Sequence, residues 1–284
     1  MQRYKKLFSF ATSFANAPHD CEMEFSGRRE ESFFGKNRGC LENFHIFAKN
    51  CTLRNAMIIT YYCIITLVII AYLLGSIPSA VWIGQHYYGI DIREYGSKNA
   101  GTTNVLRVLG WRASLPVFVI DFIKGFMAVT VMSLMRYDEH ITSAMLINLR
   151  IIATVAVVLG HIFPLFANFK GGKGVATIVG AVTGIQPEIA LICFGVWFII
   201  FMLWHYVSLA SMIAGCCFPV LVAIFSGSSY ARHGEMSVTF LIFSVIVAAL
   251  LLWTHRKNIA RLKNGTESKI ILWKHKNKHK ISDK

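Results

Sequence analysis

Charged side chains are scarce in this sequence. They make up 15% of its 284 residues, whereas hydrophobic residues make up 55%. The apolar residues are gathered into runs of roughly 17 to 25, the length at which a helix crosses the hydrocarbon core of a bilayer. A water-soluble globular domain is therefore excluded, and the sequence predicts an integral membrane protein.

Acidic residues are especially few. The chain has 15 Asp and Glu against 29 Lys and Arg, a formal net charge of +14. An excess of this size also occurs in proteins that bind nucleic acid, but here the basic residues lie mostly in loops and tails between apolar runs. Membrane orientation and anionic lipid headgroups explain that distribution better. We expect a lipid bilayer and no nucleic acid as a partner.

The sequence also lacks the common metal, redox and nucleotide motifs. Its seven cysteines form no C-x-x-C pair. Four of them, Cys63, Cys193, Cys216 and Cys217, lie within apolar runs, where we expect small buried hydrophobic residues and no disulfide or metal framework. The Gly172-Lys173 pair is followed by glycine and not by Ser or Thr, so it is not a Walker A loop. We expect neither a metal nor a cofactor.

The long apolar runs predict an all-α, polytopic membrane fold with about seven transmembrane helices joined by cytoplasmic glycine-rich loops. The run at 175–186 is short and follows directly on a glycine-rich loop, so it needs a thin bilayer or extra helical turns to cross. The predicted spans are 57–84, 113–135, 144–160, 175–186, 188–204, 206–225 and 238–254.

Loop charge predicts the orientation of these spans. Basic residues gather in the first and third linkers and in the segment after the last span, whereas 136–143 and 226–237 are mixed or nearly neutral. The positive-inside rule then puts the first, third and fifth linkers and the C-terminus in the cytoplasm, and the N-terminus outside. The polar stretches fall on one face under this arrangement, which indicates a single cytoplasmic site. They are 96–107, 160–177, 205–211 and 254–269.

Residues 1–56 differ from the remainder. They mix aromatic, charged and small residues and show neither helical nor strand periodicity. We expect an extension that is disordered, or not translated if Met57 is the true start; a weak secretory signal is the alternative. The domain of interest is then 57–269, followed by a Lys-rich cytoplasmic tail at 270–284.

The stretch GHIFPLFANFKGGKGVAT, 160–177, carries the strongest chemical signal. Irregular backbone cannot face lipid, so this stretch is covered by protein or lines a wet cavity. Glycine lets main-chain N–H groups turn toward one point, and lysines beside such a turn make an anion site, most simply for phosphate. The alternative is a plain basic cytoplasmic loop. The residues concerned are Lys170, Gly171, Gly172, Lys173 and Gly174.

A second polar stretch, GSKNAGTTNVLRVLG, covers 96–110. Its hydroxyl, amide and guanidinium groups suit a phosphate or a carboxylate. The alternative is a solvated loop that caps a helix starting near Thr102. The candidate residues are Gly96, Ser97, Asn99, Gly101, Asn104 and Arg107.

Shorter signals accompany these two stretches. Asp121 and Lys124, three apart within an apolar run, predict an internal ion pair. In HYVSLAS, Ser208 and Ser211 either cap the next helix or contribute to the site. His255 stands with Asn258 at a membrane exit, where a histidine can move a proton near neutral pH.

Two further features do not indicate a catalytic site. His86 and Asp91 form an H-x4-D pattern, but two letters with four free positions are weak evidence of acyltransferase chemistry. Ser97 and Ser211 have no triad-like neighbour, so no activated nucleophile is indicated.

Together GSKNAGTTNVLR, GHIFPLFANFKGGKGVAT, YVSLAS and THRKNIARL, in this order between apolar spans, closely resemble the bacterial acyl-phosphate:glycerol-3-phosphate acyltransferases, the PlsY family. The likeness extends from about Leu73 to Lys269 and includes DFIKG. It implies a seven-helix enzyme of the bacterial inner membrane. The implied reaction moves a fatty acyl group from acyl phosphate to the sn-1 hydroxyl of glycerol 3-phosphate, giving lysophosphatidate and phosphate in phospholipid biosynthesis, with an upstream phosphate acyltransferase supplying the donor.

The resemblance also implies roles for particular residues. Ser97, Arg107 and Lys173 would bind the acyl phosphate and the developing charge, whereas glycerol 3-phosphate would be held by Ser211, His255 and Asn258. The glycines Gly96, Gly101, Gly171, Gly172 and Gly174 and the amides Asn99 and Asn104 would complete the substrate site. No covalent intermediate is needed, since the donor is already activated, and the departing phosphate can take the hydroxyl proton.

Two positions depart from the family pattern. Lys257 replaces the usual glutamate of the last motif, and His205 replaces a residue that is often arginine, so an ion pair is missing or remade. Two other functions remained open. An anion transporter would explain the broken helix at 161–175, but no internal repeat is seen. A scaffold for anionic lipids would explain the basic tail and none of the glycine loops.

Overall fold

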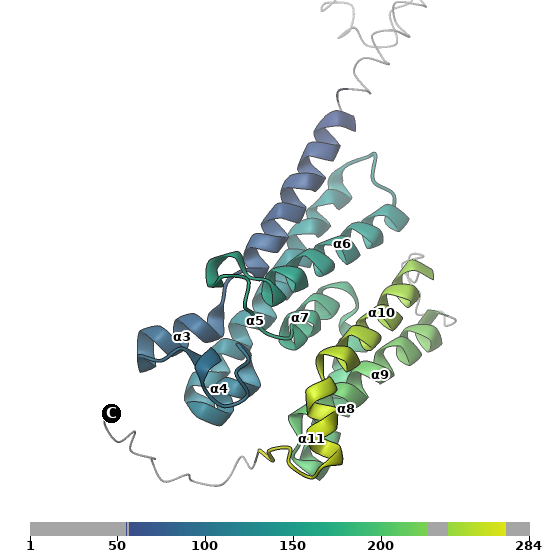
Figure 1. Cartoon of the computed structure of the whole chain (residues 1–284). Coiled ribbons are helices and arrows are strands. Elements are labelled where there is room, and N and C mark those ends of the chain that lie inside the picture. Colours follow the sequence, from purple (N-terminus) through teal and green to yellow (C-terminus); the bar gives the residue numbers. More distant parts are fainter. Residues whose placement is uncertain (1–54, 56, 227–237, 271–284) are drawn as a thin grey trace, which may run out of the picture. The chain divides into compact units, whose positions relative to one another are not determined.

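The computed structural model describes residue 55 and the segments 57–226 and 238–270. These residues are helical or irregular and include no strand, which confirms the all-α prediction (Figure 1). The predicted extension at 1–56, with the exception of residue 55, and nearly all of the tail at 270–284 lie outside the described residues. After a first helix at 57–75, the elements are α3 (Ser79–Tyr88), η1 (Ile92–Glu94), α4 (Thr102–Val108), α5 (Trp111–Met132), η2 (Ser133–Tyr137), α6 (Ser143–Ile162), η3 (Leu165–Ala167), α7 (Val175–Ile185), α8 (Pro187–Trp204), α9 (Val207–Ser226), α10 (Val238–Thr254) and α11 (Arg256–Lys263).

The first predicted span is broken. The helix at 57–75 stops before Pro78, and α3 starts again at Ser79. A proline has no N–H for the helical ladder and disfavours a helical residue before it, which explains the break. The prediction of one uninterrupted helix over 57–84 was therefore wrong at residues 76–78.

Local sequence explains most of the other helix ends. The Thr142 hydroxyl accepts a hydrogen bond from the Met145 N–H and caps α6. Pro187 occupies the first turn of α8, where its missing N–H costs nothing. His205 ends α8 in the left-handed region at φ 61°. The N-cap of α4 is Gly101, so Thr102 is the first helical residue and not the cap that the sequence suggested.

Glycines let the long helices approach one another closely. A β-carbon on Gly125 of α5 would collide with the Thr177 carbonyl of α7, and one on Gly180 of α7 would collide with Phe122. The helix at 57–75 meets α6 in the same way through Gly75 and Gly160. Small residues at such crossings are typical of membrane helices, where packing replaces the hydrophobic effect.

The largest apolar core is shared by α5 to α10. It surrounds α7, whose Ala181, Val182 and Ile185 are almost fully buried. Two smaller clusters join the helix at 57–75 to α5 and α6, and α3 to α4 and the start of α5. Figure 1 shows α7 lying between the α5–α6 pair and the α8–α10 group. This central position places the loop before α7 at the junction of both groups.

Within the residues that the structure describes, five helical segments are long and apolar enough to cross a membrane, and six if the bent pair α10 and α11 counts as one span. The short helix α7 has 11 residues. At about 1.5 Å per residue it covers only about half of a hydrocarbon core of about 30 Å. The predicted count of seven therefore depends on α7. The expectation of buried cysteines was wrong for Cys63 and Cys216, which lie exposed on outer helix faces.

Candidate active site

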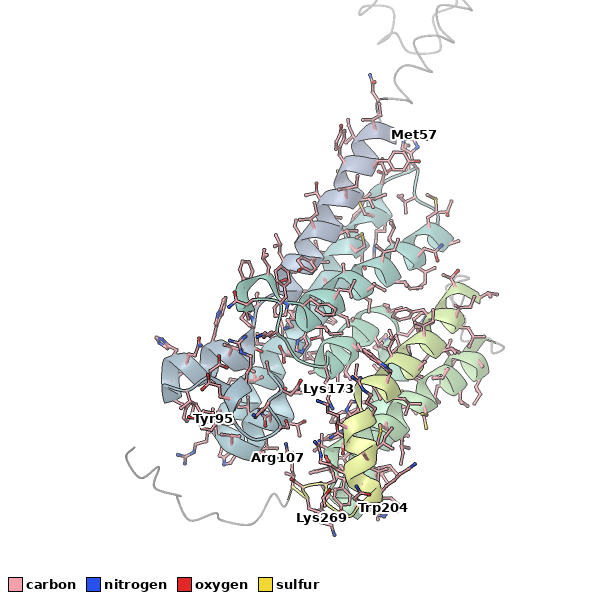
Figure 2. The ribbon with its side chains drawn as sticks, viewed as in Figure 1. Met57, Tyr95, Arg107, Lys173, Trp204 and Lys269 are labelled. Carbon is pink, nitrogen blue, oxygen red and sulfur yellow. The ribbon has the colours of Figure 1, made fainter. Side chains whose placement is uncertain are left out.

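Polar side chains from four separate parts of the chain gather beside the N-terminal end of α7. Arg107 comes from the last turn of α4, Lys173 from the loop before α7, and Asn258 from the first turn of α11. Glu267 comes from the segment after α11. Figure 2 shows Arg107 and Lys173 in the region between α4 and α11.

Lys173 and Asn258 are in direct contact. The Lys173 ammonium donates a hydrogen bond of 2.5 Å to Asn258 Oδ1, and Asn258 Nδ2 donates one of 2.9 Å to Glu267 Oε1. Asn258 is buried, at 7% exposure. Two of the stretches that the sequence singled out, 160–177 and 254–269, therefore meet through these two residues.

Glu267 connects several members of this cluster through hydrogen bonds. Its carboxylate also accepts hydrogen bonds from Arg261 Nε at 2.6 Å and from Ser208 Oγ at 3.0 Å. Burial acts to raise the pKa of this carboxyl, but the hydrogen bonds from Arg261, Asn258 and Ser208 outweigh it and lower the pKa. Glu267 is thus charged, and it joins α11 to the start of α9.

The cluster holds more positive than negative charge. Burial lowers the pKa of Lys173 to about 8, helped by the neighbouring Arg261 and Arg107 and opposed by Glu267. Burial also lowers the pKa of Arg107. The Arg107 Nε atom is buried and has no hydrogen-bond partner in the described part of the chain. Because partly buried cations and an unpartnered buried N–H need compensation, this arrangement suits an anionic ligand.

The tautomer of His255 follows from its contacts. Its Nδ1 atom lies 2.8 Å from the Leu251 carbonyl oxygen, which can only accept a hydrogen bond, so Nδ1 carries the proton. In the neutral ring Nε2 is then an acceptor. His255 is buried, at 4% exposure, and it interacts electrostatically with Lys173 and Glu267. It therefore belongs to the same cluster and offers a lone pair to a hydroxyl group.

The glycines before α7 act differently from the expectation. The N–H groups of Gly171 and Gly172 donate to the carbonyls of Ile162 and His161, at 3.1 and 3.2 Å, and so are not turned toward a ligand. Gly174 adopts φ 78° and starts α7. The groups of this loop that suit an anion are therefore the Lys173 ammonium and the start of α7, because the free N–H groups and the dipole of a helix N-terminus favour negative charge.

The 96–107 loop is held together by Asn104. Its Oδ1 accepts from the Ser97 N–H at 2.8 Å, and its Nδ2 donates to the Ile92 and Tyr95 carbonyls at 3.0 Å each. Asn104 thus shapes the loop from a fully buried position. Gly96 at φ 59° makes the turn, and a β-carbon there would meet Asn104.

The remaining residues predicted in this loop lie at its surface or at its end. Ser97 is exposed, Asn99 is half-buried and Gly101 precedes α4. Among the described residues, no hydrogen bond or ion pair joins Ser97 to Lys173. The structure thus places Arg107, in the last turn of α4, in the cluster and Ser97 outside it.

Neither serine at the start of α9 caps that helix. Ser208 donates to Glu267, and Ser211, one turn later, accepts a hydrogen bond of 3.2 Å from Trp197 Nε1. Both are buried, at 6% exposure each. Ser211 therefore lies on the same helix face as a member of the cluster.

Two other predictions are settled by ion pairs. Asp121 and Lys124 form the predicted internal pair, at 2.8 Å. The Asp91 carboxylate of the H-x4-D pattern is held by Arg93, whose guanidinium also donates to the carbonyls of Ala167 and Lys170. Asp91 thus has a structural role, fixing the loop before α7, in keeping with the dismissal of that pattern.

Sequence reasoning missed Glu267 and Arg261. One signal was present: Glu267 is the sole acidic residue of the stretch 254–269. Lys257, which stands where the family usually has glutamate, is exposed. The carboxylate that pairs with a basic residue of α11 is Glu267, ten residues further along the chain.

These features define an all-helical membrane protein with a cluster of cationic side chains near the ends of its helices. A family model for glycerol-3-phosphate acyltransferases matches residues 65–265. The chain is 39% identical over 231 residues to a glycerol-3-phosphate acyltransferase of Chlorobium limicola, covering 75% of this chain and 98% of that protein. A Chlorobaculum parvum protein of the same name is 42% identical over 230 residues, covering 75% and 97%.

The fold is also found among solved structures. A crystal structure of PlsY, an integral membrane glycerol 3-phosphate acyltransferase, in its glycerol 3-phosphate form matches with a TM-score of 0.62 and 38% identity, over 73% of this chain and 96% of that one. A lysophosphatidic acid form of PlsY matches with a TM-score of 0.60 and 37% identity, over 74% and 96%. The chain belongs to the glycerol-3-phosphate acyltransferase family.

Proposed function

We propose that this protein transfers a fatty acyl group from acyl phosphate to the sn-1 hydroxyl of glycerol 3-phosphate, forming lysophosphatidate and inorganic phosphate. The observation that carries the proposal is the cluster of Arg107, Lys173 and Arg261 around a single carboxylate, Glu267. Both proposed substrates carry a phosphate group, and a half-buried cluster of cations in which the Arg107 Nε atom has no partner among the described residues is suited to hold phosphate. Family membership supports the acceptor, glycerol 3-phosphate.

The proposed chemistry needs positioning and charge neutralisation. The sn-1 oxygen attacks the acyl carbonyl carbon, the bond from that carbon to the phosphate oxygen breaks, and phosphate leaves with the electron pair. Lys173 and Arg107 neutralise charge that grows on the carbonyl oxygen and on the leaving phosphate. The departing phosphate takes the hydroxyl proton, so no covalent enzyme intermediate forms and atoms balance.

His255 fits the acceptor side of this reaction. Its Nδ1 proton is engaged by the Leu251 carbonyl, so Nε2 accepts a hydrogen bond from a glycerol hydroxyl and orients it. Asn258, fixed between Lys173 and Glu267, positions Lys173 beside the same substrate. We place Ser211 beside glycerol 3-phosphate, on the side away from His255. We place Ser97 and the glycines of the stretches 96–110 and 160–177 beside the phosphate groups of the substrates.

An apolar groove formed by the last helices suits the fatty chain of the donor. It has a volume of about 570 Å³ and is lined by side chains of α8 to α11, among them Met212, Cys216 and Ile259. Two of its lining residues are sequence neighbours of predicted site residues, since Met212 follows Ser211 and Ile259 follows Asn258. We propose that the acyl chain lies in this groove with its phosphate end toward Lys173.

The proposed setting is the bacterial cytoplasmic membrane, with seven helices and the site facing the cytoplasm. The seventh helix is α7, short but enclosed by the longer helices. Basic residues of the first and third linkers support this orientation. We assign the supply of acyl phosphate to an upstream phosphate acyltransferase. The phosphate headgroup of this lipid is water-soluble, so a site on the cytoplasmic face can receive it.

The direct test is acyl transfer by the purified full-length protein in liposomes. Acyl phosphate and labelled glycerol 3-phosphate are supplied, acyl-CoA replaces acyl phosphate in the control, and the position of the acyl group in the product is determined. We expect 1-acyl lysophosphatidate with acyl phosphate alone. Transfer from acyl-CoA at an equal or higher rate, or a 2-acyl product, would contradict the proposed donor or the proposed hydroxyl.

A further inference from the structure

A second buried polar cluster lies behind the loop that carries Lys173. Asp121 of α5 pairs with Lys124 at 2.8 Å and accepts from the Ser79 hydroxyl at 2.7 Å. His161, near the end of α6, places Nδ1 3.6 Å from the same Asp121 oxygen and 3.3 Å from the Thr177 hydroxyl of α7. All five side chains are buried, at 6% exposure or less.

His161 faces the loop with its other ring nitrogen. A β-carbon on Gly172 would collide with His161 Nε2 and with the Ala100 carbonyl oxygen, so the ring lies directly against the backbone of Gly172. The main-chain carbonyl of His161 also accepts the Gly172 N–H. Gly172 immediately precedes Lys173. The ring and the backbone of His161 therefore support this loop from one side.

The same cluster joins the other helix breaks of this region. Lys124 donates a hydrogen bond of 3.0 Å to the Ile77 carbonyl, in the break before α3. Ala100, whose carbonyl oxygen lies close to Gly172, belongs to the loop before α4. Helix α4 supplies Arg107. Charged groups inside membrane helices are costly and mark functional positions by default. Helices α5 and α7 also pack closely at Gly125 and Gly180.

We propose that His161, held by Asp121, is a positioning residue for Lys173. It fixes the backbone of Gly172 on one side and Thr177 in the first turn of α7 on the other, and so sets where the Lys173 ammonium lies. His161 does not touch the substrates in this arrangement. The inference rests on the proposed role of Lys173 in acyl transfer.

A double-mutant cycle tests this inference. His161→Asn keeps an amide near the Nδ1 position, facing Asp121, and removes the ring atoms that lie against Gly172. We expect it to lower kcat about tenfold when Lys173 is present, because displacing a catalytic group by a fraction of an ångström has effects of this order. In the Lys173→Met background the same change should lower kcat less than about twofold, since residues that act as a unit are not additive.

A purely structural role gives a different pattern. If His161 is only structural, His161→Asn reduces the amount of folded protein by the same factor in both backgrounds. An equal loss of kcat in both backgrounds would therefore overturn the inference. His86→Asn is the matched control, because His86 is exposed on α3, and we expect it to leave the kcat of each background unchanged. Thermal melting in detergent monitors folding. If His161→Asn does not fold, Thr177→Val replaces it, and the same non-additivity is required.

The cycle is measured with whichever acyl donor the native protein uses. A native protein that uses acyl-CoA and not acyl phosphate refutes the proposed donor, while a non-additive cycle still supports the position of His161. A native protein that uses acyl phosphate but gives an additive cycle refutes only the positioning role. The two failures are therefore distinguishable.

Discussion

Replacing Lys173 with methionine removes one charge and keeps the apolar stem of the side chain. The ammonium lies 2.5 Å from Asn258 Oδ1, and Asn258 is itself fixed by Glu267. The charge is therefore preorganised before substrate binds. If it faces charge that grows on the acyl oxygen and leaving phosphate, it helps the transition state more than the ground state. Loss of one such donor lowers kcat by about two to three powers of ten.

The assay is steady-state acyl transfer with labelled glycerol 3-phosphate at saturating donor. KM for glycerol 3-phosphate should change much less than kcat, since that substrate is assigned to His255, Asn258 and Ser211. His255→Ala should show the complementary pattern, with KM for glycerol 3-phosphate raised most. The two variants together separate charge neutralisation from acceptor binding.

Lys170→Met is the internal control. Lys170 lies three residues before Lys173 in the same basic loop, but it is exposed, and its contact with Arg93 is made by its main-chain carbonyl. We expect kcat within about twofold of the native value. Equal and modest losses in Lys170→Met and Lys173→Met would show that the loop is only a basic cytoplasmic anchor. The site proposed for Lys173 would then be wrong.

Three further predictions follow from the same geometry. Burial and neighbouring cations lower the pKa of Lys173 to about 8, so its ammonium form is lost as pH rises through 8. We therefore expect kcat/KM to fall above that pH. Lys173→Arg should lack this alkaline limb in a pH profile. Glu267→Gln removes a charge that raises the pKa of Lys173, so the limb should move to lower pH, and an unmoved limb would show that Glu267 does not act on Lys173. Single cysteines placed at Gly101 and Lys170 in a cysteine-free protein should react with an impermeant thiol reagent only from the cytoplasmic side, and one at Asp138 only from outside. Labelling of positions 101 and 170 from opposite faces would contradict a shared site.

Most of the fold could be predicted because apolar runs directly report membrane helices. The limits of α6, α8, α9 and α10 lie within two residues of the predicted spans. The break at 76–78 was not predicted, since a continuous apolar run hides a stop that only Pro78 marks. The length of α7 was ambiguous for a physical reason. Eleven apolar residues fit a short buried helix as well as part of a span.

The cluster was predictable only in part. Lys173, Arg107, His255 and Asn258 carry rare charges or polar groups in an apolar chain, and each was identified from the sequence. Glu267 was missed, because its role depends on the turn after α11 that brings it back beside Asn258.

The glycines show a different limit. Sequence reveals that Gly172 permits a close approach, but it does not reveal what approaches. A ligand phosphate was expected, and the structure places His161 there instead. The direction of a main-chain N–H depends on tertiary contacts that spacing does not encode.

In the proposed reaction, with acyl phosphate as donor, the charge balance of the site bears on where the hydroxyl proton goes. The cations of Arg107, Lys173 and Arg261 face the single carboxylate of Glu267, which leaves an excess of about two positive charges near pH 7. Two phosphate groups carry about three to four negative charges there. The occupied site therefore stays anionic, and residual negative charge favours protonation of the leaving phosphate. A basic side chain at the hydroxyl is then not needed, and the neutral Nε2 of His255 has only to orient it.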